Sequence, residues 1–304
     1  MSWFFVALIA PLLWSLVNHC DKFILSRYFK GGGSGGLMIF SGVVGLPLAV
    51  ALFIFFPEVL SVSITDALIL IGTGLLYNIG VYLYLLALEH EDASYIVPFW
   101  QLVPVFSYFI GIFVLGEYIS SSKILSGIVV LVGALILSIE FDRGYFRINR
   151  RTVKIMVASS LALALSYTLF KKSTIDDSSF ILSMFWNQFG FFLFGALCFM
   201  VPKYRGEFLN VIDQNSSGVL GLNIVEQAVE TIGVMASNFS VLLAPAALVI
   251  LVEYTAQPFF VFAEGIILTI LFPQFVKEDI SHGNLAQKFV SIIIMAIGLY
   301  MINI

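Results

Sequence analysis

Two apolar runs separated by a short acidic break decide the fold of this chain. Residues 64–117 read ITDALILIGTGLLYNIGVYLYLLALEHEDASYIVPFWQLVPVFSYFIGIFVLGE. Each run has roughly the 20 residues that a helix, rising 1.5 Å per residue, needs to cross a bilayer core about 30 Å thick. The break carries Glu89, Glu91 and Asp92, which favour water over lipid. The stretch therefore predicts two membrane-spanning helices joined by a polar turn.

The composition extends this interpretation to the whole chain. Of its 304 residues, 60% are hydrophobic and only 11% are charged, whereas soluble domains carry roughly 25% charged residues. Such a chain cannot cover a water-facing surface, which excludes a soluble enzyme and a disordered scaffold. The formal net charge of −4 leaves no basic face for a nucleic acid. Cys20 and Cys198 lie in or beside apolar runs, so no disulfide framework is expected.

Applied along the chain, the same length criterion predicts ten spans. They lie near residues 2–22, 36–56, 66–88, 94–115, 121–139, 152–171, 180–201, 217–239, 245–271 and 286–303. Most are apolar on every face, which favours helices over the alternating strands of an outer-membrane barrel. No connection is long enough to hold a folded soluble domain. The predicted fold class is an all-α membrane protein with ten transmembrane helices.

The basic residues predict the orientation of these helices. With the connections numbered by the spans they join, the odd ones hold 12 of the 15 Lys and Arg residues. Cytoplasmic connections carry an excess of Lys and Arg, so we expect the odd connections in the cytoplasm and both termini outside. The lack of a targeting extension fits the inner (plasma) membrane of a bacterium or archaeon.

The chain shows an internal repeat of five spans plus five. The landmarks that keep their order are Pro57 with Pro202, Gly80 with Gly233, Pro104 with Pro258, Ser126 with Ser291 and Gly133 with Gly298. We expect a first repeat over 1–140, a basic connecting loop over 141–151 and a second repeat over 152–304. Because five is odd, the second repeat would enter from the opposite side, an arrangement typical of alternating-access carriers. Chance similarity between apolar helices is the alternative interpretation.

The region around the acidic break also resembles a known family. Residues 87–98, ALEHEDASYIVP, continue through Leu102-Val103-Pro104-Val105-Phe106 to Leu115-Gly116-Glu117, and a glycine-containing apolar helix follows. This pattern resembles the half-repeat of EamA-type transporters in the drug/metabolite transporter superfamily. The resemblance implies a basket of ten helices around a central cavity, and transport of a small solute. The second half departs from the pattern, because Leu271-Phe272-Pro273 stands where Leu-Gly-Glu would be expected.

Spans eight and nine carry the residues most indicative of function. Glu226 and Glu230 lie four residues apart on one helical face, as do Glu253, Gln257 and Glu264 on the next span. Each buried charge costs about 2.5–3.5 kcal/mol on insertion scales. The few candidate basic partners lie near span ends: His19, Lys22, Lys171 and Lys172. We therefore expect these carboxyl groups to be protonated, hydrogen-bonded or neutralised by a cation, in a functional or a purely structural role.

Polar aromatic and amide side chains at similar depth would complete a pocket. The candidates are Trp14 and Asn18 of span one, Tyr77, Asn78 and Tyr82 of span three, Trp100 and Gln101 of span four, and Tyr254 of span nine. Tryptophan and tyrosine rings can face a cation, although they are also common at lipid interfaces. In the repeat alignment, Tyr77 corresponds to Glu230.

These features predict a secondary carrier and not an enzyme. The expected partners are the lipid bilayer, a small cationic or zwitterionic metabolite or drug-like solute, and protons bound by the intramembrane Glu residues. No cofactor is expected, because the chain has no GxxxxGK[ST] loop and its three histidines are too scattered for a metal site. Two alternatives stay open: a flippase for a lipid-linked substrate, and a non-transporting membrane subunit.

Overall fold

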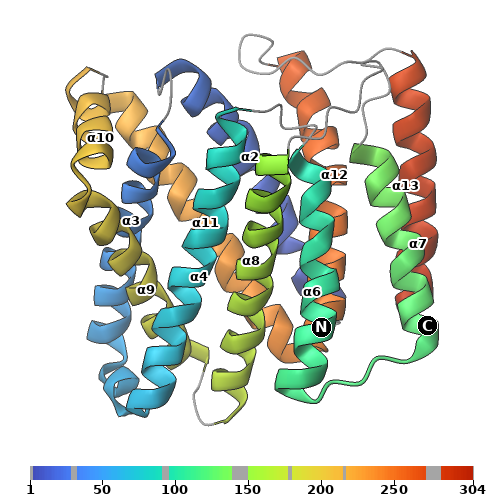
Figure 1. The fold of residues 1–304 in the computed structure, drawn as a ribbon, viewed down its shortest axis with the longest axis horizontal. Coiled ribbons are helices and arrows are strands. Elements are labelled where there is room, and N and C mark those ends of the chain that lie inside the picture. Colours follow the sequence, from blue (N-terminus) through green and yellow to red (C-terminus); the bar gives the residue numbers. More distant parts are fainter. Residues whose placement is uncertain are drawn as a thin grey trace.

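The computed structural model describes residues 3–28, 33–90, 96–138, 150–176, 180–214, 217–271 and 282–303. All regular elements in these ranges are helical, which confirms the all-α prediction (Figure 1). The elements are α1 (Trp3–Ala7), α2 (Ile9–Tyr28), α3 (Ser34–Phe55), η1 (Pro57–Ser61), α4 (Ile64–Leu88), η2 (Val97–Gln101), α6 (Leu102–Leu115), α7 (Ser121–Ser138), α8 (Arg150–Asp176), α9 (Phe180–Met200), α10 (Pro202–Gln214), α11 (Ser217–Leu243), α12 (Ala246–Leu271) and α13 (His282–Asn303).

Every span predicted from the sequence corresponds to a helix or a pair of consecutive helices. Within the described ranges, six helical segments are long and apolar enough to cross a membrane, and three shorter apolar helices accompany them. Helix α11, 27 residues long, carries Glu226 and Glu230 and is not among these segments. The protein is therefore an integral membrane protein built from helices.

Three boundaries differ from the sequence predictions. The first span was expected to end near residue 22, but α2 continues to Tyr28. Residues 202–214 were expected in a connection and instead form α10, which packs on α3 and α9. The predicted basic loop at 141–151 lies outside the described residues except for Arg150 and Arg151, which begin α8.

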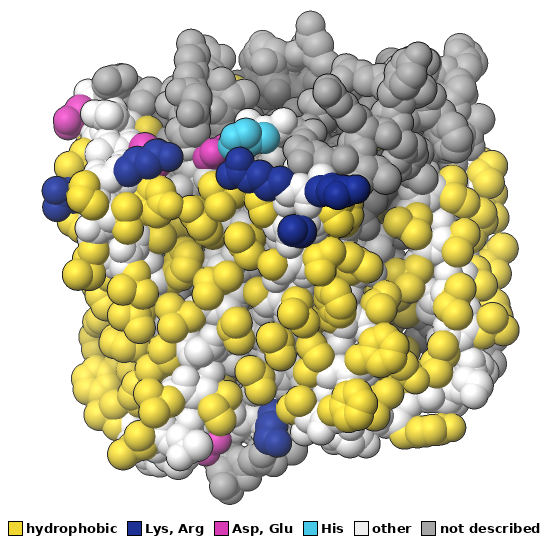
Figure 2. Space-filling model, in the orientation of Figure 1, with side chains coloured by type: hydrophobic (Ala, Val, Ile, Leu, Met, Phe, Trp, Pro, Cys, Tyr) yellow, Lys and Arg dark blue, Asp and Glu magenta, His cyan; other side chains and the backbone are white. Residues whose placement is uncertain are grey.

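The helix ends gather at two opposite faces of the bundle (Figure 1). The start of α3, the end of α4, the start of α8 and the end of α12 lie at the upper face, together with α10. Figure 2 shows an apolar band across this face of the molecule, with Lys and Arg side chains concentrated along its upper rim. This band is the surface that a bilayer core would cover.

Carboxylates cap the start of α3 at the upper face. Glu89, just after α4, accepts hydrogen bonds from the backbone N–H groups of Gly33 and Ser34 at 2.8 and 2.9 Å, and from the Ser34 hydroxyl. Glu207 of α10 accepts a longer bond of 3.2 Å from the Gly36 N–H. Residues 34–36, the end of a glycine-rich stretch, open α3. The negative charges suit the positive end of the α3 dipole.

A close helix crossing holds the two halves of the chain together. A Cβ atom added to Gly74 of α4 would lie 2.2 Å from the carbonyl oxygen of Asn187 in α9. One added to Gly190 of α9 would lie 2.4 Å from the carbonyl oxygen of Ile71. No side chain fits at either position, so the two backbones touch directly, as small residues allow in membranes.

A second crossing, between α7 and α13, is reciprocal. A Cβ atom at Gly133 would lie 3.1 Å from the carbonyl oxygen of Ser291, and one at Gly298 would lie 3.1 Å from that of Ser126. These are the residues that the repeat alignment pairs, Gly133 with Gly298 and Ser126 with Ser291. A twofold relation between the halves would produce this reciprocity, and the boundaries of the repeats stay a prediction.

Removing the Glu89 cap is expected to destabilise the protein in a pH-dependent way. Burial alone would raise the pKa of Glu89, but the hydrogen bonds from Ser34 and Gly33 lower it below its ordinary value. A carboxyl with a lowered pKa contributes stability above its unfolded-state pKa, and this is lost as the pH falls through the folded-state pKa. We expect Glu89→Ala to cost about 0.5–2 kcal/mol near neutral pH, as losing a helix cap does.

The measurement is thermal unfolding of the detergent-purified protein at neutral and at acidic pH. The gap in melting temperature between wild type and Glu89→Ala should close in acid. Glu58→Ala is the matched control, because Glu58 is an exposed acidic residue at the other face. A gap that stays constant with pH would show that the charge of Glu89 does not contribute.

Candidate solute-binding site

A cavity lies inside the bundle between helices of both halves. Its volume, counted as the space that the centre of a water molecule can occupy, is about 40 Å³, which is enough for a few waters. Its lining residues come from α2, α4, η2, α8, α11 and α12: Trp14, Val17, Asn18, Asp21, Tyr77, Val81, Tyr84, Trp100, Leu163, Glu230, Tyr254 and Gln257. Carboxyl and amide groups here meet aromatic rings, as in a site for a small organic ligand.

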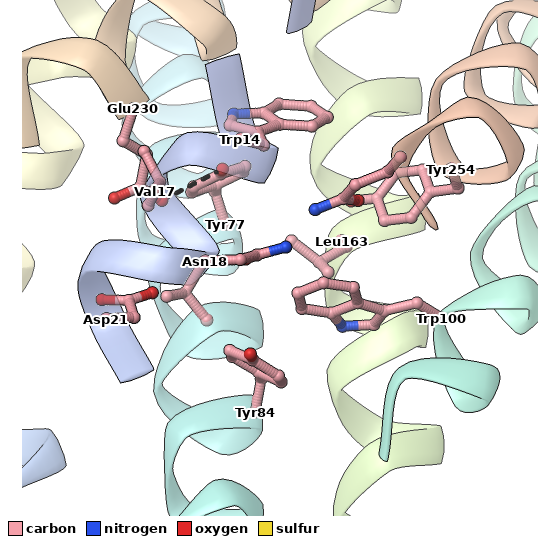
Figure 3. A pocket seen from close by; sticks show the side chains of 12 residues that line it. Trp14, Val17, Asn18, Asp21, Tyr77, Tyr84, Trp100, Leu163, Glu230 and Tyr254 are labelled. Atoms are coloured by element: carbon pink, nitrogen blue, oxygen red, sulfur yellow. Dashed lines mark hydrogen bonds between the residues drawn. The ribbon is translucent and has the colours of Figure 1, made fainter. Parts of the chain in front are cut away.

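Two carboxyl groups form one side of the cavity (Figure 3). Asp21 of α2 and Glu230 of α11 are 7% and 8% exposed. The hydroxyl of Tyr77 donates a hydrogen bond of 3.2 Å to Glu230, so the two residues that the repeat alignment pairs meet across the cavity. Glu226, one turn away on α11, lies close enough to interact electrostatically with both acids. None of the lining residues is Lys or Arg.

Aromatic rings form the opposite side (Figure 3). The ring centroids of Tyr84 and Trp100 are 4.4 Å apart, and those of Trp100 and Tyr254 are 6.3 Å apart in an edge-to-face arrangement. Trp14 lies 6.0 Å from Tyr254. Ring faces beside buried carboxyl groups attract a cation both by charge and through the ring quadrupole.

The lysine at the end of span six does not form an ion pair with the carboxyl groups of the cavity. Lys171 instead forms an ion pair of 2.6 Å with Glu117 and donates a hydrogen bond of 2.7 Å to the carbonyl of Ala244. Glu117 also accepts hydrogen bonds from the N–H of Ala246 at the start of α12. The Leu-Gly-Glu sequence therefore places its carboxylate at a helix start, and Gly116 ends α6 with a positive φ of 65° that favours glycine.

A proline in α12 explains the position of Gln101. Pro258 has no backbone N–H, so the carbonyl of Tyr254, four residues earlier, loses its usual helical partner. The side-chain Nε2 of Gln101, at the end of η2, donates to that carbonyl oxygen at 3.0 Å. Gln101 thus fixes η2 to α12 beside two cavity-lining rings, those of Trp100 and Tyr254.

A double-mutant cycle tests this link. Gln101→Leu leaves the Tyr254 carbonyl unpaired and is expected to cost about 1–3 kcal/mol of stability. In a Pro258→Ala background, the new N–H at position 258 can bond the carbonyl, so the same substitution should cost much less. Unfolding of the four proteins in detergent measures both losses. Equal losses in the two backgrounds would contradict the link.

The structure brings together seven of the twelve predicted site residues. Those that line the cavity are Trp14, Asn18, Tyr77, Trp100, Glu230, Tyr254 and Gln257.

The other five predicted site residues are placed beside the cavity or away from it. Glu226 is buried and bonded by the amide of Gln227, and Gln101 holds the Tyr254 carbonyl. Glu253 is bonded by Ser237, between α11 and α12.

Asn78 and Tyr82 make contacts elsewhere on α4. The amide of Asn78 donates to the carbonyl of Gly74 in its own helix. The hydroxyl of Tyr82 is hydrogen-bonded to that of Tyr204 in α10. These two residues therefore bond neither to one another nor to the cavity-lining acids.

Asp21 and Tyr84 are lining residues that the sequence analysis did not select. Asp21 lies three residues after Asn18 and seven after Trp14, so helical spacing alone places it on the same face of α2. The predicted first span, 2–22, includes Asp21, but Asp21 was not among the residues predicted for the site. In the structure it is buried within the bundle.

The bundle and its cavity define an all-helical membrane protein. The model of the EamA-like transporter family matches residues 1–139, which confirms the resemblance found in the first half and is consistent with the drug/metabolite transporter superfamily. One crystal structure, described only as that of a protein, covers 99% of this chain and 98% of its own. The two share 15% identity with a TM-score of 0.70, which shows the fold alone. No curated protein gives a match.

Proposed function

We propose that this protein is a secondary carrier of a small organic solute that bears a positive charge, either a cation or a zwitterion. The observation that carries the proposal is the cavity in which Asp21 and Glu230 face aromatic rings, with no lysine or arginine among the lining residues. A buried carboxylate without a cation is costly, so a cationic ligand would be held by charge and by the rings together.

The transport cycle that we propose is alternating access between two five-helix repeats. The reciprocal crossing of α7 and α13 and the meeting of Tyr77 with Glu230 support an inverted repeat with its axis near the cavity. The cavity of about 40 Å³ holds only a few waters, so an organic solute needs a wider cavity than this conformation offers. Opening of one face at a time would supply that space.

Protons are the coupling ion that the buried acids favour. Asp21, Glu226, Glu230 and Glu253 are all buried, and the two lysine ion pairs found in the described residues involve Glu117 and Glu207 instead. Carboxyl groups in this setting bind either a proton or a cation. The proposed orientation, from the charge of the connections, has the odd connections and α10 in the cytoplasm of a bacterial or archaeal cell.

A lipid-linked substrate fits this cavity less well. A flippase site for a phosphate-bearing head group needs basic side chains, because phosphate is held by arginine and lysine. The lining residues offer acids and amides. A non-transporting subunit would bind no solute at all.

A thermal-shift screen of the purified protein tests the proposed function. The solutes are tetramethylammonium, putrescine, lysine, betaine, glucose and succinate. Cationic and zwitterionic solutes should raise the melting temperature, because a ligand that binds the native state stabilises it. Stabilisation by succinate alone, or by none of the six, would overturn the proposal.

Matched variants locate the site. Glu230→Gln and Asp21→Asn should each weaken cation binding about tenfold or more, since about 1.4 kcal/mol corresponds to a factor of ten. Glu264→Gln serves as the control, because Glu264 is an acid of α12 that does not line the cavity. Equal affinity for the cation in Glu230→Gln and in wild type would contradict the proposed role of Glu230 in binding it.

A further inference from the structure

Glu253 is a buried acid that the solute cavity does not use. Its side chain is 0% exposed and is absent from the cavity lining. One carboxyl oxygen, Oε2, accepts a hydrogen bond of 2.6 Å from the hydroxyl of Ser237 on α11. The other oxygen, Oε1, is buried without a hydrogen-bond partner in the described structure. Burying a charged carboxylate with one neutral partner and no cation is costly. A carboxyl group in this setting therefore avoids that cost only by holding a proton.

The groups around Glu253 connect it to the cavity. The hydroxyls that interact with it electrostatically are those of Tyr77 on α4, Tyr167 on α8 and its neighbour Tyr254. The Tyr167 and Tyr254 hydroxyl oxygens are 3.5 Å apart, and Tyr77 donates to Glu230.

The acids of the cavity lie beyond these hydroxyls. Asp21 of α2 and Glu226 and Glu230 of α11 interact with one another. Tyr77 and Tyr254 each interact with both Glu230 and Glu253. On α8, Lys171 is paired with Glu117. The two tyrosines therefore link Glu253 to the cavity acids.

We infer that Glu253 binds the proton that is exchanged for the solute, from a position outside the solute cavity. This inference rests on the proposed function, because it assigns separate residues to the two cargoes. Asp21 and Glu230 touch the solute, and Glu253 senses it through the field across Tyr77, Tyr167 and Tyr254.

The sense of the coupling follows from charge. A cation beside Asp21 and Glu230 favours negative charge at Glu253, so the O–H bond of its carboxyl breaks and the proton leaves for water. A proton on Glu253 removes that negative charge and weakens cation binding by the same factor, because linkage is reciprocal. The carrier would therefore exchange protons for the cation rather than move them together.

Tetramethylammonium is the probe for this inference, because its charge does not change with pH. Neutral tert-butanol, of similar size, is the matched ligand. Calorimetry at two pH values on either side of neutrality should show wild type binding the cation about 5- to 150-fold more tightly at the higher pH, the usual range of coupling between sites. Binding heats in buffers of different ionisation enthalpy should show proton release with the cation and none with tert-butanol.

Two pairs of variants show which residue causes the pH dependence of cation affinity. Glu253→Gln should keep cation binding and lose most of the pH dependence of its affinity and most of the proton release, the remainder coming from the cavity acids, and Glu264→Gln on the same helix should behave as wild type. Ser237→Ala should displace the pH midpoint, whereas Ser240→Ala should not, because Ser240 bonds only the carbonyl of Ala236. In proteoliposomes, Glu253→Gln should retain cation exchange and lose uptake driven by a proton gradient.

The outcomes separate this inference from the proposed function. Wild type that binds no cation contradicts the proposed function, and the inference with it. Wild type that binds the cation with no pH dependence or proton release overturns the inference alone. So does a Glu253→Gln protein whose affinity varies with pH as much as that of wild type. If Glu253→Gln does not fold, the proton count in wild type and the comparison of Ser237→Ala with Ser240→Ala decide the matter.

Discussion

Inside a bilayer the protein must satisfy its own polar groups, because lipid offers no hydrogen bonds and no counter-ions. Most buried groups of this protein meet that condition locally. Serine and threonine hydroxyls bond carbonyls one turn away, as Thr168 does with Ala164, and Gln101 replaces the N–H that Pro258 lacks. The central acids differ in charge. Among the described residues, their hydrogen bonds come from one tyrosine, one serine and one amide, and from no basic side chain.

Carboxylates outside the central layer have fixed partners. Glu89 caps α3 at the upper face, and Glu117 caps α12 at the opposite face with Lys171 as its counter-ion. Both carboxylates belong to the first half of the chain. Glu89 fixes the start of a helix in the same half, and Glu117 fixes the start of a helix in the second half. Carboxylates with permanent partners at the two faces, and acids without a counter-ion between them, fit the proposed carrier with a central site.

The sequence predicted the helices well because hydrophobic length is a strong, local signal. It predicted seven cavity residues because helical spacing and repeat alignment place them at one depth. It was incomplete where the arrangement depended on a tertiary contact. The helical start of α3 depends on Glu89, 55 residues further along the chain. Tyr82 was grouped with the pocket because it shares a helical face with Asn78, and its hydroxyl instead bonds Tyr204 on α10, a helix that was not predicted. Asp21 lies within the predicted first span but was not among the predicted site residues.

The crossing of Gly74 and Gly190 limits how α4 can move. With backbones in direct contact, the two helices can tilt about this point more easily than they can separate. From Gly74 to Leu88 α4 extends about 21 Å at 1.5 Å per residue, so a tilt of about 10° would move Leu88 by about 4 Å. Tyr77, one turn from the crossing, would hardly move, whereas Tyr84 would travel about 3 Å on the same estimate. One small rotation of α4 would thus keep Tyr77 beside Glu230 while displacing Tyr84 from the ring of Trp100.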